Sequence, residues 1–373
     1  MSCRKPRILL VVPLPPPFHG ASLMSQQVAD SRYLKDRYRI GVLPLRFTRT
    51  VEEIGKFSPR KVVKMAALSV RLFFHLLLFR PRLVYYVVTH RGYSFYRDCL
   101  FVFIIKLFRR RIVFHQHNKG ALDPADGRWK RFLRRNLFRG TYAIVLSPLL
   151  VYDIEPFVPR PRIFIVANGL PDVKPPPPQK KTTVPAILFL SNLIVEKGVF
   201  VLLEALALLK RKGIPFKGIF AGNWSYNLDE SAFRKKADSL GTGDAVEVVG
   251  PVYGERKIEL LCRSDIFVFP TFHESFGNVV LEAMRASLPV VATDEGSLPF
   301  IVEDGRTGFI CHKKDAGSLA EKIETLLGDR DLREEMGRRG RRRFLDHFTL
   351  ETFEHNMNRV FQKILGEQHC QTP

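Results

Sequence analysis

Short apolar runs alternate with helix-like stretches along most of the chain, and this series occurs twice. In the first half, the runs that predict strands lie at residues 8–12, 40–43, 83–88, 112–115, 143–146 and 163–166. In the second half they lie at residues 187–190, 218–221, 246–249, 266–270, 290–292 and 308–311. Strands that alternate with helices pair in parallel and are covered by helices on both faces. The pattern therefore predicts an α/β fold with two Rossmann-like, doubly wound domains.

A proline-rich stretch separates the two series. Residues 171–181 include four consecutive prolines, which lack a backbone donor and cannot continue a helix or a central strand. A chain of 373 residues also exceeds the size at which a single core keeps growing. We therefore expect an N-terminal domain over residues 1–170, a stiff linker over 171–181 and a C-terminal domain over 182–349.

The net charge of +22 belongs entirely to the first half of the chain. Residues 1–170 carry 31 Lys and Arg against 9 Asp and Glu, whereas the remaining residues carry 28 of each. Such a field suits nucleic acid or an anionic membrane surface. Residues 61–80 join a long apolar face to flanking cations, as interfacial helices do, and no nucleic-acid-binding motif is present. We therefore expect an anionic membrane surface as a partner and no nucleic acid.

Alternatives remain open for the apolar and basic segments. Residues 65–79 also fit a buried core helix. Residues 109–111 and 128–139 add basic surface, although the second stretch also fits an ordinary solvated helix face.

We expect no membrane-spanning helix and no signal peptide. The stretches 65–79 and 99–108 contain charged residues and fall short of the roughly 20 apolar residues that a spanning helix needs. The apolar run at 8–14 is broken by proline and fits a first strand better than a signal peptide. Five widely spaced cysteines fit a reducing compartment. The expected location is cytoplasmic and peripheral, at the inner face of the membrane.

Two glutamates eight residues apart flank a predicted helix start. Residues 266–270 predict a buried strand and residues 278–286 the helix after it, so Glu274 lies in the turn and Glu282 about one and a half turns into the helix. Parallel α/β sheets bind ligands at the carboxyl ends of strands, beside helix N-termini that attract phosphate. An ionised carboxylate accepts two hydrogen bonds, which suits a ribose or sugar diol. This spacing is typical of a nucleotide-sugar site.

Residues 271–292 resemble the signature of family 4 glycosyltransferases, in which two such glutamates are followed by a small residue, a proline and an apolar strand. The resemblance implies the GT-B architecture, with two Rossmann-like domains facing across a cleft and a last helix, here 350–367, that completes the N-terminal domain. It implies that Glu274 contacts the transferred sugar and Glu282 the nucleotide ribose. Further donor-binding residues implied by the resemblance are Ser275, Phe276, Gly277 and Asn278.

The resemblance extends to other predicted strand ends. Gly20 matches a glycine turn near the donor phosphate. His117 matches a histidine that lies against the transferred sugar, with His115 as a weaker alternative. Lys197 matches the cation that binds the diphosphate, and Gly222 matches a loop that frames the nucleotide base, as do residues 250–254.

Two positions depart from the family pattern. His19 stands where the first glycine of a pair is usual, and Asn192 stands where an arginine of the phosphate clamp is common. The clamp therefore has one cation fewer, and Arg263 and Lys313 are candidates to replace its charge. We count Asn192 among the donor-binding residues.

No cofactor and no metal ion are expected. The triplet Asp329-Arg330-Asp331 resembles a metal-binding motif, but it lies in a polar turn between predicted tail helices. Metal-independent members of this fold stabilise the leaving diphosphate with cations and helix N-termini.

The resemblance implies a retaining glycosyltransferase that uses a nucleotide diphosphate sugar as donor. The basic N-terminal half indicates a lipid-linked or anionic glycan acceptor, as in cell-surface polysaccharide or lipopolysaccharide synthesis. The expected catalytic residues are His117, Glu274 and Lys197. Two alternatives stay open: a catalytically degenerate sugar-nucleotide-binding assembly subunit, which Asn192 favours, and a GT-B-like sugar-nucleotide epimerase, which needs no acceptor.

Overall fold

The computed structural model describes residues 5–47, 59–173, 184–225 and 227–366. The chain divides into two compact units, Met1–Asn168 together with Phe353–Pro373, and Gly169–Thr352. We call them the N-terminal unit and the C-terminal unit. Their boundary falls after Asn168, ahead of the predicted linker, and residues 174–181 of that linker lie outside the described residues.

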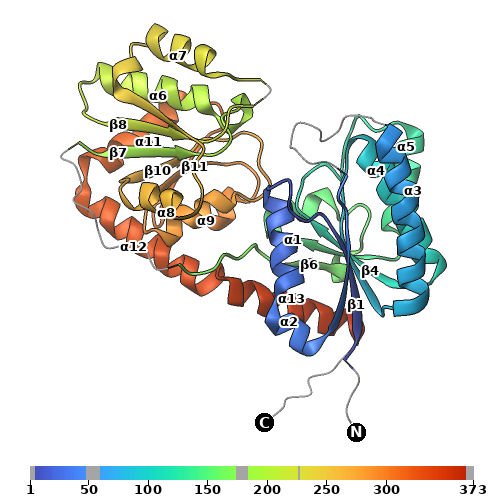
Figure 1. Cartoon of the computed structure of the whole chain (residues 1–373). Helices are drawn as coiled ribbons and strands as arrows, with labels where there is room; N and C mark the ends of the chain where they lie inside the picture. The colour runs from blue at the N-terminus through green and yellow to red at the C-terminus, as the bar shows by residue number, and fades with distance from the viewer. Residues whose placement is uncertain (1–4, 48–58, 174–183, 226, 367–373) are drawn as a thin grey trace, which may run out of the picture. The chain divides into compact units, whose positions relative to one another are not determined.

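The N-terminal unit is built on a six-stranded parallel sheet with the strand order β2-β1-β3-β4-β5-β6. Its strands are Arg7–Val12 (β1), Arg39–Pro44 (β2), Leu83–Val87 (β3), Arg111–Gln116 (β4), Tyr142–Val145 (β5) and Ile163–Ile165 (β6). Its helices are Gly20–Asp30 (α1), Arg32–Arg37 (α2), Pro59–Phe74 (α3), Gly92–Leu107 (α4), Arg128–Phe138 (α5) and Leu350–Leu365 (α13). Figure 1 shows α3, α4 and α5 on one face of the sheet and α1, α2 and α13 on the other. Because both faces are covered, every residue of β3 is buried.

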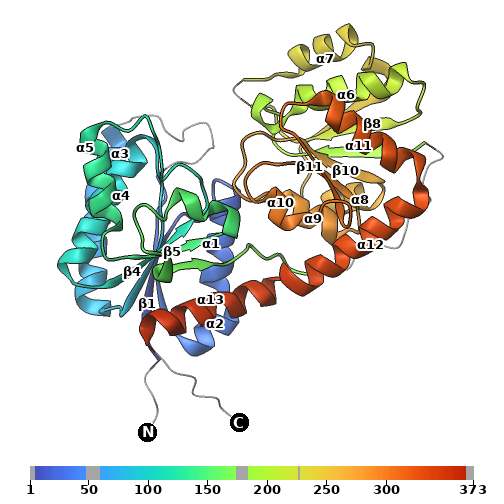
Figure 2. The same cartoon turned by 180° about the vertical axis from the view of Figure 1, so that it is seen from behind.

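The C-terminal unit has a second six-stranded parallel sheet, with the order β12-β11-β10-β7-β8-β9. Its strands are Ala186–Leu190 (β7), Lys217–Ala221 (β8), Val246–Gly250 (β9), Ile266–Phe269 (β10), Val290–Thr293 (β11) and Gly308–Cys311 (β12). Its helices are Val199–Arg211 (α6), Glu230–Ser239 (α7), Gly254–Cys262 (α8), Asn278–Arg285 (α9), Leu298–Ile301 (α10), Ala316–Gly328 (α11) and Arg330–His347 (α12). α6 packs with α11 and α9 packs with α12, on opposite faces of the sheet (Figure 2). The predicted α/β fold with two doubly wound parallel sheets is confirmed.

The last helix packs on the N-terminal unit. The hydroxyl of Tyr38 donates to Oδ1 of Asn358 over 2.8 Å. The ring of Phe361 meets those of Tyr38 and Tyr85 edge to face, a favoured geometry for aromatic pairs. From Phe353 onward α13 therefore belongs to the N-terminal unit, although the C-terminal unit precedes it in the chain.

The long apolar segment forms α3 and continues as a π-helical turn over His75–Phe79. Over Lys61–Phe79 it has 19 residues and a hydropathy of 1.8, so by length and composition alone it is long and apolar enough to cross a membrane. The prediction that this segment is too short to span was therefore wrong. The alternative of a buried core helix is wrong for most of its surface, since 17% of its most apolar stretch is buried.

A second helix also exposes an apolar row. On α4 the side chains at intervals of three and four residues share one face, and they are between 38% and 65% exposed. They are Tyr93, Tyr96, Leu100, Phe103 and Leu107. This row extends well beyond the apolar run that the sequence indicated at residues 99–108.

The basic helix α5 is a surface helix with one buried cation. Arg131 is exposed, as are the stacked rings of Trp129 and Phe132, whose centroids lie 5.5 Å apart. Arg134 is instead fully buried, with Nε 2.9 Å from Oδ2 of Asp126. A buried guanidinium needs such a partner, so Arg134 stabilises the fold and does not add to the basic surface predicted for residues 128–139.

Candidate functional site

The turns after β7 and β10 meet at the point where the strand order of the C-terminal sheet reverses. β7 pairs with β10 in parallel, so both strands end at the same edge of the sheet. Gly198 has a φ of +79°, and a Cβ there would lie 2.0 Å from the carbonyl oxygen of Pro270, so a larger residue would clash. The carbonyl oxygen of Glu196 also accepts the backbone N–H of Phe272 over 3.0 Å. In doubly wound sheets the ligand crevice lies at this reversal.

Lys197 and Glu274 form an ion pair at this edge. Nζ of Lys197 lies 2.8 Å from Oε2 of Glu274 and donates to the carbonyl oxygen of His273 over 3.1 Å. The two side chains are 17% and 21% exposed, so they remain within reach of a ligand from solution. The two turns therefore bring the predicted diphosphate cation and the predicted sugar-binding carboxylate into direct contact.

The carboxylate of Glu274 also bonds to its own loop. Oε1 accepts the backbone N–H groups of Ser275 over 2.8 Å and of Phe276 over 3.3 Å. Successive backbone N–H groups together with a lysine form a concave site for an anion. Glu274 thus supplies the negative charge that these three donors hold in this structure.

Glu282 lies on α9 and contacts α8. Its Oε1 is 2.6 Å from Nζ of Lys257, while its Oε2 is buried and has no hydrogen-bond partner among the described residues. An unpaired buried carboxylate oxygen is unfavourable, so this atom is ready to accept a hydrogen bond from a ligand. Lys257 was not predicted from the sequence, because nothing in its local pattern indicates contact with a residue 25 positions later.

Two further predicted loops lie at the same edge. The N–H of Gly222 donates to the carbonyl oxygen of Gly250 over 2.9 Å, and Nδ2 of Asn223 donates to the hydroxyl of Tyr253 over 2.8 Å. At Gly222 a Cβ would lie 1.7 Å from the carbonyl oxygen of Ser191, so the turns after β7 and β8 touch. The carboxyl edge of this sheet therefore carries the predicted residues Asn192, Lys197, Gly222, Glu274, Ser275, Phe276, Gly277, Asn278 and Glu282.

The two candidates to replace the missing clamp arginine lie in different places. Lys313 is near the Glu274 loop, because Nζ lies 2.9 Å from Oε2 of Glu295, whose Oε1 accepts the N–H of Glu274 over 3.2 Å. Arg263 follows α8 and precedes β10, at the opposite edge of the sheet. Asn192 itself is exposed. Of the two, only Lys313 lies at the carboxyl edge of the sheet, and its compensation for Asn192 stays a prediction.

In the N-terminal unit, His115 and His117 lie on the same side of the end of β4. Their ring centroids are 4.0 Å apart, and Nδ1 of His115 pairs with the hydroxyl of Tyr85. Burial and the neighbouring His117 hold the pKa of His115 well below its usual value. Burial, with a smaller effect from His19, lowers the pKa of His117 to about 3. His117 is therefore neutral at pH 7, and its buried Nε2 has no partner among the described residues.

His19 and Gly20 lie at the start of α1. His19 is the N-cap, with Nδ1 accepting the N–H of Ser22 over 3.3 Å, and Gly20 is the first residue of the helix. His19 also contributes to the lowered pKa of His117, after the larger effect of burial.

Buried polar groups that were not predicted from the sequence support the loop after His117. The carboxylate of Asp153 accepts the backbone N–H groups of residues 120–122 over 2.8 to 3.0 Å. His90, at the end of β3, pairs with Oε1 of Gln116, and burial lowers its pKa to about 4. Because Asp153 follows this loop by about 30 residues, local spacing gives no signal for it.

The described residues hold no group of three His, Cys, Asp or Glu side chains placed to bind a metal ion. In the Asp329-Arg330-Asp331 triplet, Asp329 caps α12 by accepting the N–H of Leu332 over 2.8 Å. That contact gives the triplet a structural role. The expected independence from metal stays a prediction.

Known proteins resemble the chain most clearly in the C-terminal unit. Residues 172–343 match the family model described as glycosyl transferases group 1. The capsular polysaccharide biosynthesis glycosyltransferase CapM of Staphylococcus aureus is 30% identical over 181 residues, which are 48% of this chain and 46% of CapM. The chain spans less than half the length of the curated relatives it matches.

Solved structures share the fold over nearly the whole chain. A glycosyltransferase from Rickettsia africae has a TM-score of 0.76 at 17% identity, covering 98% of this chain and all of that one. Anabaena Alr3699/HepE in complex with UDP has a TM-score of 0.75 at 19% identity, covering 96% of this chain and all of that one, and it is also known with UDP-glucose. The fold is therefore the GT-B architecture of glycosyltransferases. Residues 172–343, within the C-terminal unit, are similar to the group 1 glycosyltransferase family, which agrees with the resemblance drawn from Glu274 and Glu282.

Proposed function

We propose that the chain is a retaining glycosyltransferase that moves a sugar from a nucleotide diphosphate sugar to a lipid-linked or glycan acceptor in cell-surface polysaccharide or lipopolysaccharide synthesis. The observation that carries the proposal is the arrangement of Lys197, Glu274 and Glu282 at the reversal of the C-terminal sheet. The similarity to CapM, a capsular polysaccharide biosynthesis glycosyltransferase, supports an acceptor of polysaccharide synthesis, and the UDP and UDP-glucose complexes of Anabaena Alr3699/HepE support a nucleotide-sugar donor.

In this proposal the diphosphate of the nucleotide sugar displaces the carboxylate of Glu274 from the three groups that donate hydrogen bonds to it. Lys197 and the N–H groups of Ser275 and Phe276 then bind phosphate oxygens, and Glu274 turns to accept hydroxyls of the sugar. The unpartnered Oε2 of Glu282 accepts a ribose hydroxyl. The same three hydrogen-bonding groups thus bind the Glu274 carboxylate when no nucleotide sugar is present, and the diphosphate when it is bound.

The transfer step follows from this placement. The bond between C1 of the sugar and the phosphate oxygen breaks, and Lys197 stabilises the negative charge that develops on the departing diphosphate. The acceptor hydroxyl attacks C1 from the face that the leaving group occupied, and its proton passes to the departing phosphate. The configuration at C1 is therefore retained without a covalent enzyme intermediate.

We further propose that the N-terminal unit docks on an anionic membrane surface, at the inner face of the membrane, where a lipid-linked acceptor is held. Within α3, α4 and α5 the acidic residue is Asp98, which is fully buried, so the exposed charges of these helices are cations beside apolar side chains. Leu68 and Leu72 on α3 and Leu76 in the π-helical turn are buried in the unit. That burial favours a helix that lies in the membrane interface over one that crosses the bilayer.

Donor binding is tested by thermal stabilisation with a panel of UDP-, GDP-, ADP- and CMP-sugars. A ligand at about 100 times its Kd adds about 2.7 kcal/mol of stability. We expect one nucleotide class to raise the Tm of the wild type, and to raise that of Glu282→Gln by half as much or less. The control Glu247→Gln removes the carboxylate of an exposed pair with Lys217 in the same unit and should behave as wild type. The donor site is refuted if no nucleotide class stabilises the wild type.

Product analysis then separates the three candidate activities. A transferase releases nucleotide only when an acceptor is present and leaves the anomeric configuration unchanged. An epimerase converts the donor with no acceptor, and a binding subunit shows saturable affinity without product.

A further inference from the structure

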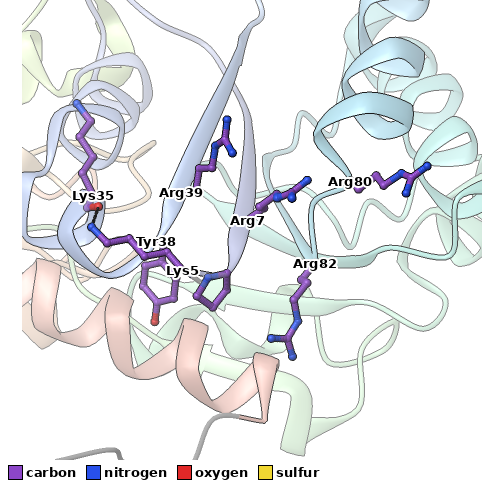
Figure 3. A pocket seen from close by; sticks show the side chains of 8 residues that line it. Lys5, Arg7, Lys35, Tyr38, Arg39, Arg80 and Arg82 are labelled. Carbon is purple, nitrogen blue, oxygen red and sulfur yellow. Dashed lines mark hydrogen bonds between the residues drawn. The ribbon is translucent and has the colours of Figure 1, made fainter. Parts of the chain in front are cut away.

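Six cations gather at the amino edge of the N-terminal sheet, the edge opposite to His117. They line an open pocket of about 480 Å³ together with a proline and a tyrosine, and the described residues that line it include no Asp or Glu. Their side chains are drawn in Figure 3. They lie at or just before the starts of β1, β2 and β3, on α2, and directly after the π-helical turn. These six residues, which we call the basic pocket, are Lys5, Arg7, Lys35, Arg39, Arg80 and Arg82.

The register of the sheet forces three of these arginines together. Arg7 and Arg39 are direct cross-strand partners of β1 and β2, and the N–H of Arg82 donates to the carbonyl oxygen of Arg7 over 2.8 Å. Neighbouring strands lie about 4.8 Å apart, and like charges directly opposite each other destabilise a sheet. In Figure 3 the side chains of Arg7 and Arg39 extend to the same side. Their mutual repulsion would be relieved by an anion.

Within the described part of the chain, side chains of this pocket donate hydrogen bonds to backbone carbonyl oxygens. Arg7 and Arg80 donate to the π-helical turn, over 2.8 Å and 3.2 Å, and Arg82 donates to Leu365 at the end of α13 over 3.4 Å. A helix C-terminus offers only about half a negative charge. Lys35 lies 3.9 Å from Asp30, and both side chains are about half exposed or more. Among the described residues, the cations of this pocket therefore outnumber the carboxylates beside them.

The chemistry of the pocket suits phosphate. Guanidinium groups bind phosphate oxygens with two parallel hydrogen bonds, which makes arginine clusters selective for phosphate over single-point anions. The pocket also adjoins apolar surface, because Leu77 and Leu78, shortly before Arg80, are 41% and 73% exposed. A phosphate group with an attached acyl chain matches both features at once.

We propose that the basic pocket binds phosphate groups carried by lipids at a membrane surface. The inference rests on the membrane docking proposed above and does not depend on sugar transfer. The pocket would hold the N-terminal unit on the membrane at the end of α3, where the exposed apolar surface of that helix adjoins the pocket. It also makes phosphate-bearing lipids, and not anionic surfaces in general, the preferred surface.

The test compares two double variants of the full chain that lose equal charge. Arg39→Gln with Arg80→Gln removes two cations from the pocket, and both are exposed side chains. Arg160→Gln with Arg162→Gln removes two exposed cations beside β6, at the other end of the strand order. Binding is measured by cosedimentation with phosphatidylcholine vesicles that contain phosphatidic acid, or oleate at the same surface charge. Circular dichroism checks that each variant is folded.

We expect the pocket variant to bind phosphatidic acid vesicles about 30-fold more weakly, equivalent to about 1 kcal/mol for each cation. The β6 variant should lose much less, and the wild type should prefer phosphatidic acid to oleate. If both variants lose vesicle binding equally, or if the wild type shows no preference for phosphatidic acid over oleate, the basic pocket is not a phosphate site. Docking on anionic membranes in general would still stand. A wild type that binds neither vesicle would overturn docking and the inference together, without touching the donor site.

Inorganic pyrophosphate separates a lipid from a soluble source. If the phosphates come from lipids, pyrophosphate should compete weakly with phosphatidic acid vesicles and should produce little thermal stabilisation. Strong stabilisation by pyrophosphate that is lost in the pocket variant, without any preference for phosphatidic acid vesicles, would overturn the membrane as the source.

Discussion

The two units share one fold but carry charge in different ways. Both are six-stranded, doubly wound parallel sheets, yet residues 1–170 hold all of the net charge while the rest of the chain is balanced. At the carboxyl edge of the C-terminal sheet, cations are paired with carboxylates: Lys197 with Glu274, Lys257 with Glu282, and Lys313 with Glu295. At the corresponding edge of the N-terminal sheet the groups are neutral histidines, and at its other edge they are clustered arginines.

This difference separates two kinds of recognition. Paired charges hold each side chain in place and can be exchanged for the charges of one small ligand, which suits a diphosphate sugar. An unbalanced field acts over a distance of about 10 Å and suits an extended surface. By our proposals, the same scaffold therefore supports a defined ligand site in one unit and a surface contact in the other.

Acidification should produce the largest difference between the units. His90, His115 and His117 are buried, and burial lowers the pKa of His90 to about 4 and that of His117 to about 3. Below about pH 6.5 the unfolded chain binds protons that the native histidines do not, so the free energy of unfolding falls as the pH falls. Each histidine costs about 1.4 kcal/mol per pH unit, or about 4 kcal/mol for three at pH 5.5. The loss continues until the pH reaches the native pKa values.

The two tryptophans allow each unit to be followed separately. Trp129 lies in the N-terminal unit and Trp224 in the C-terminal unit, where the described histidines are not buried. Thermal unfolding of the single-tryptophan variants Trp224→Phe and Trp129→Phe should show a large loss of Tm between pH 7.5 and pH 5.5 only for the Trp129 signal. Equal losses for both signals would contradict a histidine origin.

Loss of Lys197 should affect chemistry and leave the membrane contact intact. Lys197→Met removes the cation of the Glu274 loop, so we expect turnover to fall by about 10² to 10³, the usual effect of losing one preorganised transition-state partner. Lys217→Met is the matched control, because Lys217 pairs with Glu247 at an exposed site in the same unit. Turnover and vesicle cosedimentation are measured for both variants. A parallel loss of vesicle binding in Lys197→Met would break the proposed division between the units.

The fold was predictable because the spacing of apolar residues that marks a strand or a helix is visible within a short segment of the sequence. All twelve predicted strands are present, with bounds that differ by a residue or two, and the Glu274 turn lies where the run before it indicated. Exposure was less predictable: the apolar face of α3 resembles a core helix in sequence, and Arg134 resembles its exposed neighbours. Burial depends on what packs opposite a residue, which local spacing does not encode.

Contacts between segments that are far apart in the sequence also could not be predicted. Lys257 reaches Glu282 because α8 lies beside α9, and Asp153 holds a loop about 30 residues earlier. Arg7 and Arg39 belong to separate segments, and only the pairing of β1 with β2 makes them neighbours.

Removal of the charge of Glu282 should weaken donor binding by a smaller factor. Glu282→Gln keeps the shape but loses a charged acceptor, and such hydrogen bonds contribute about 1.5 to 3 kcal/mol, so we expect donor affinity to fall at least tenfold. Lys257→Met should show whether the pair acts as a unit. If it does, the double variant will lose less affinity than the sum of the single losses, measured by titration calorimetry with the donor. Strictly additive losses would mean that Lys257 does not hold Glu282 for the ligand.

The smallest expected effect distinguishes apolar from electrostatic contact in membrane docking. Leu107, on the exposed row of α4, is 65% exposed, and Leu345 on α12 of the C-terminal unit is 37% exposed. Leu107→Ser should weaken vesicle binding roughly fivefold, about 1 kcal/mol for partial burial of one leucine, while Leu345→Ser should have no effect. Cosedimentation at low and high salt adds the decisive contrast, because salt screens cations and leaves apolar burial largely unchanged. The Leu107 effect should therefore persist at high salt, whereas the Arg39 and Arg80 effect should fade. A Leu107 effect that disappears with salt would mean that α4 does not enter the bilayer interface and that charge alone brings this unit to the membrane.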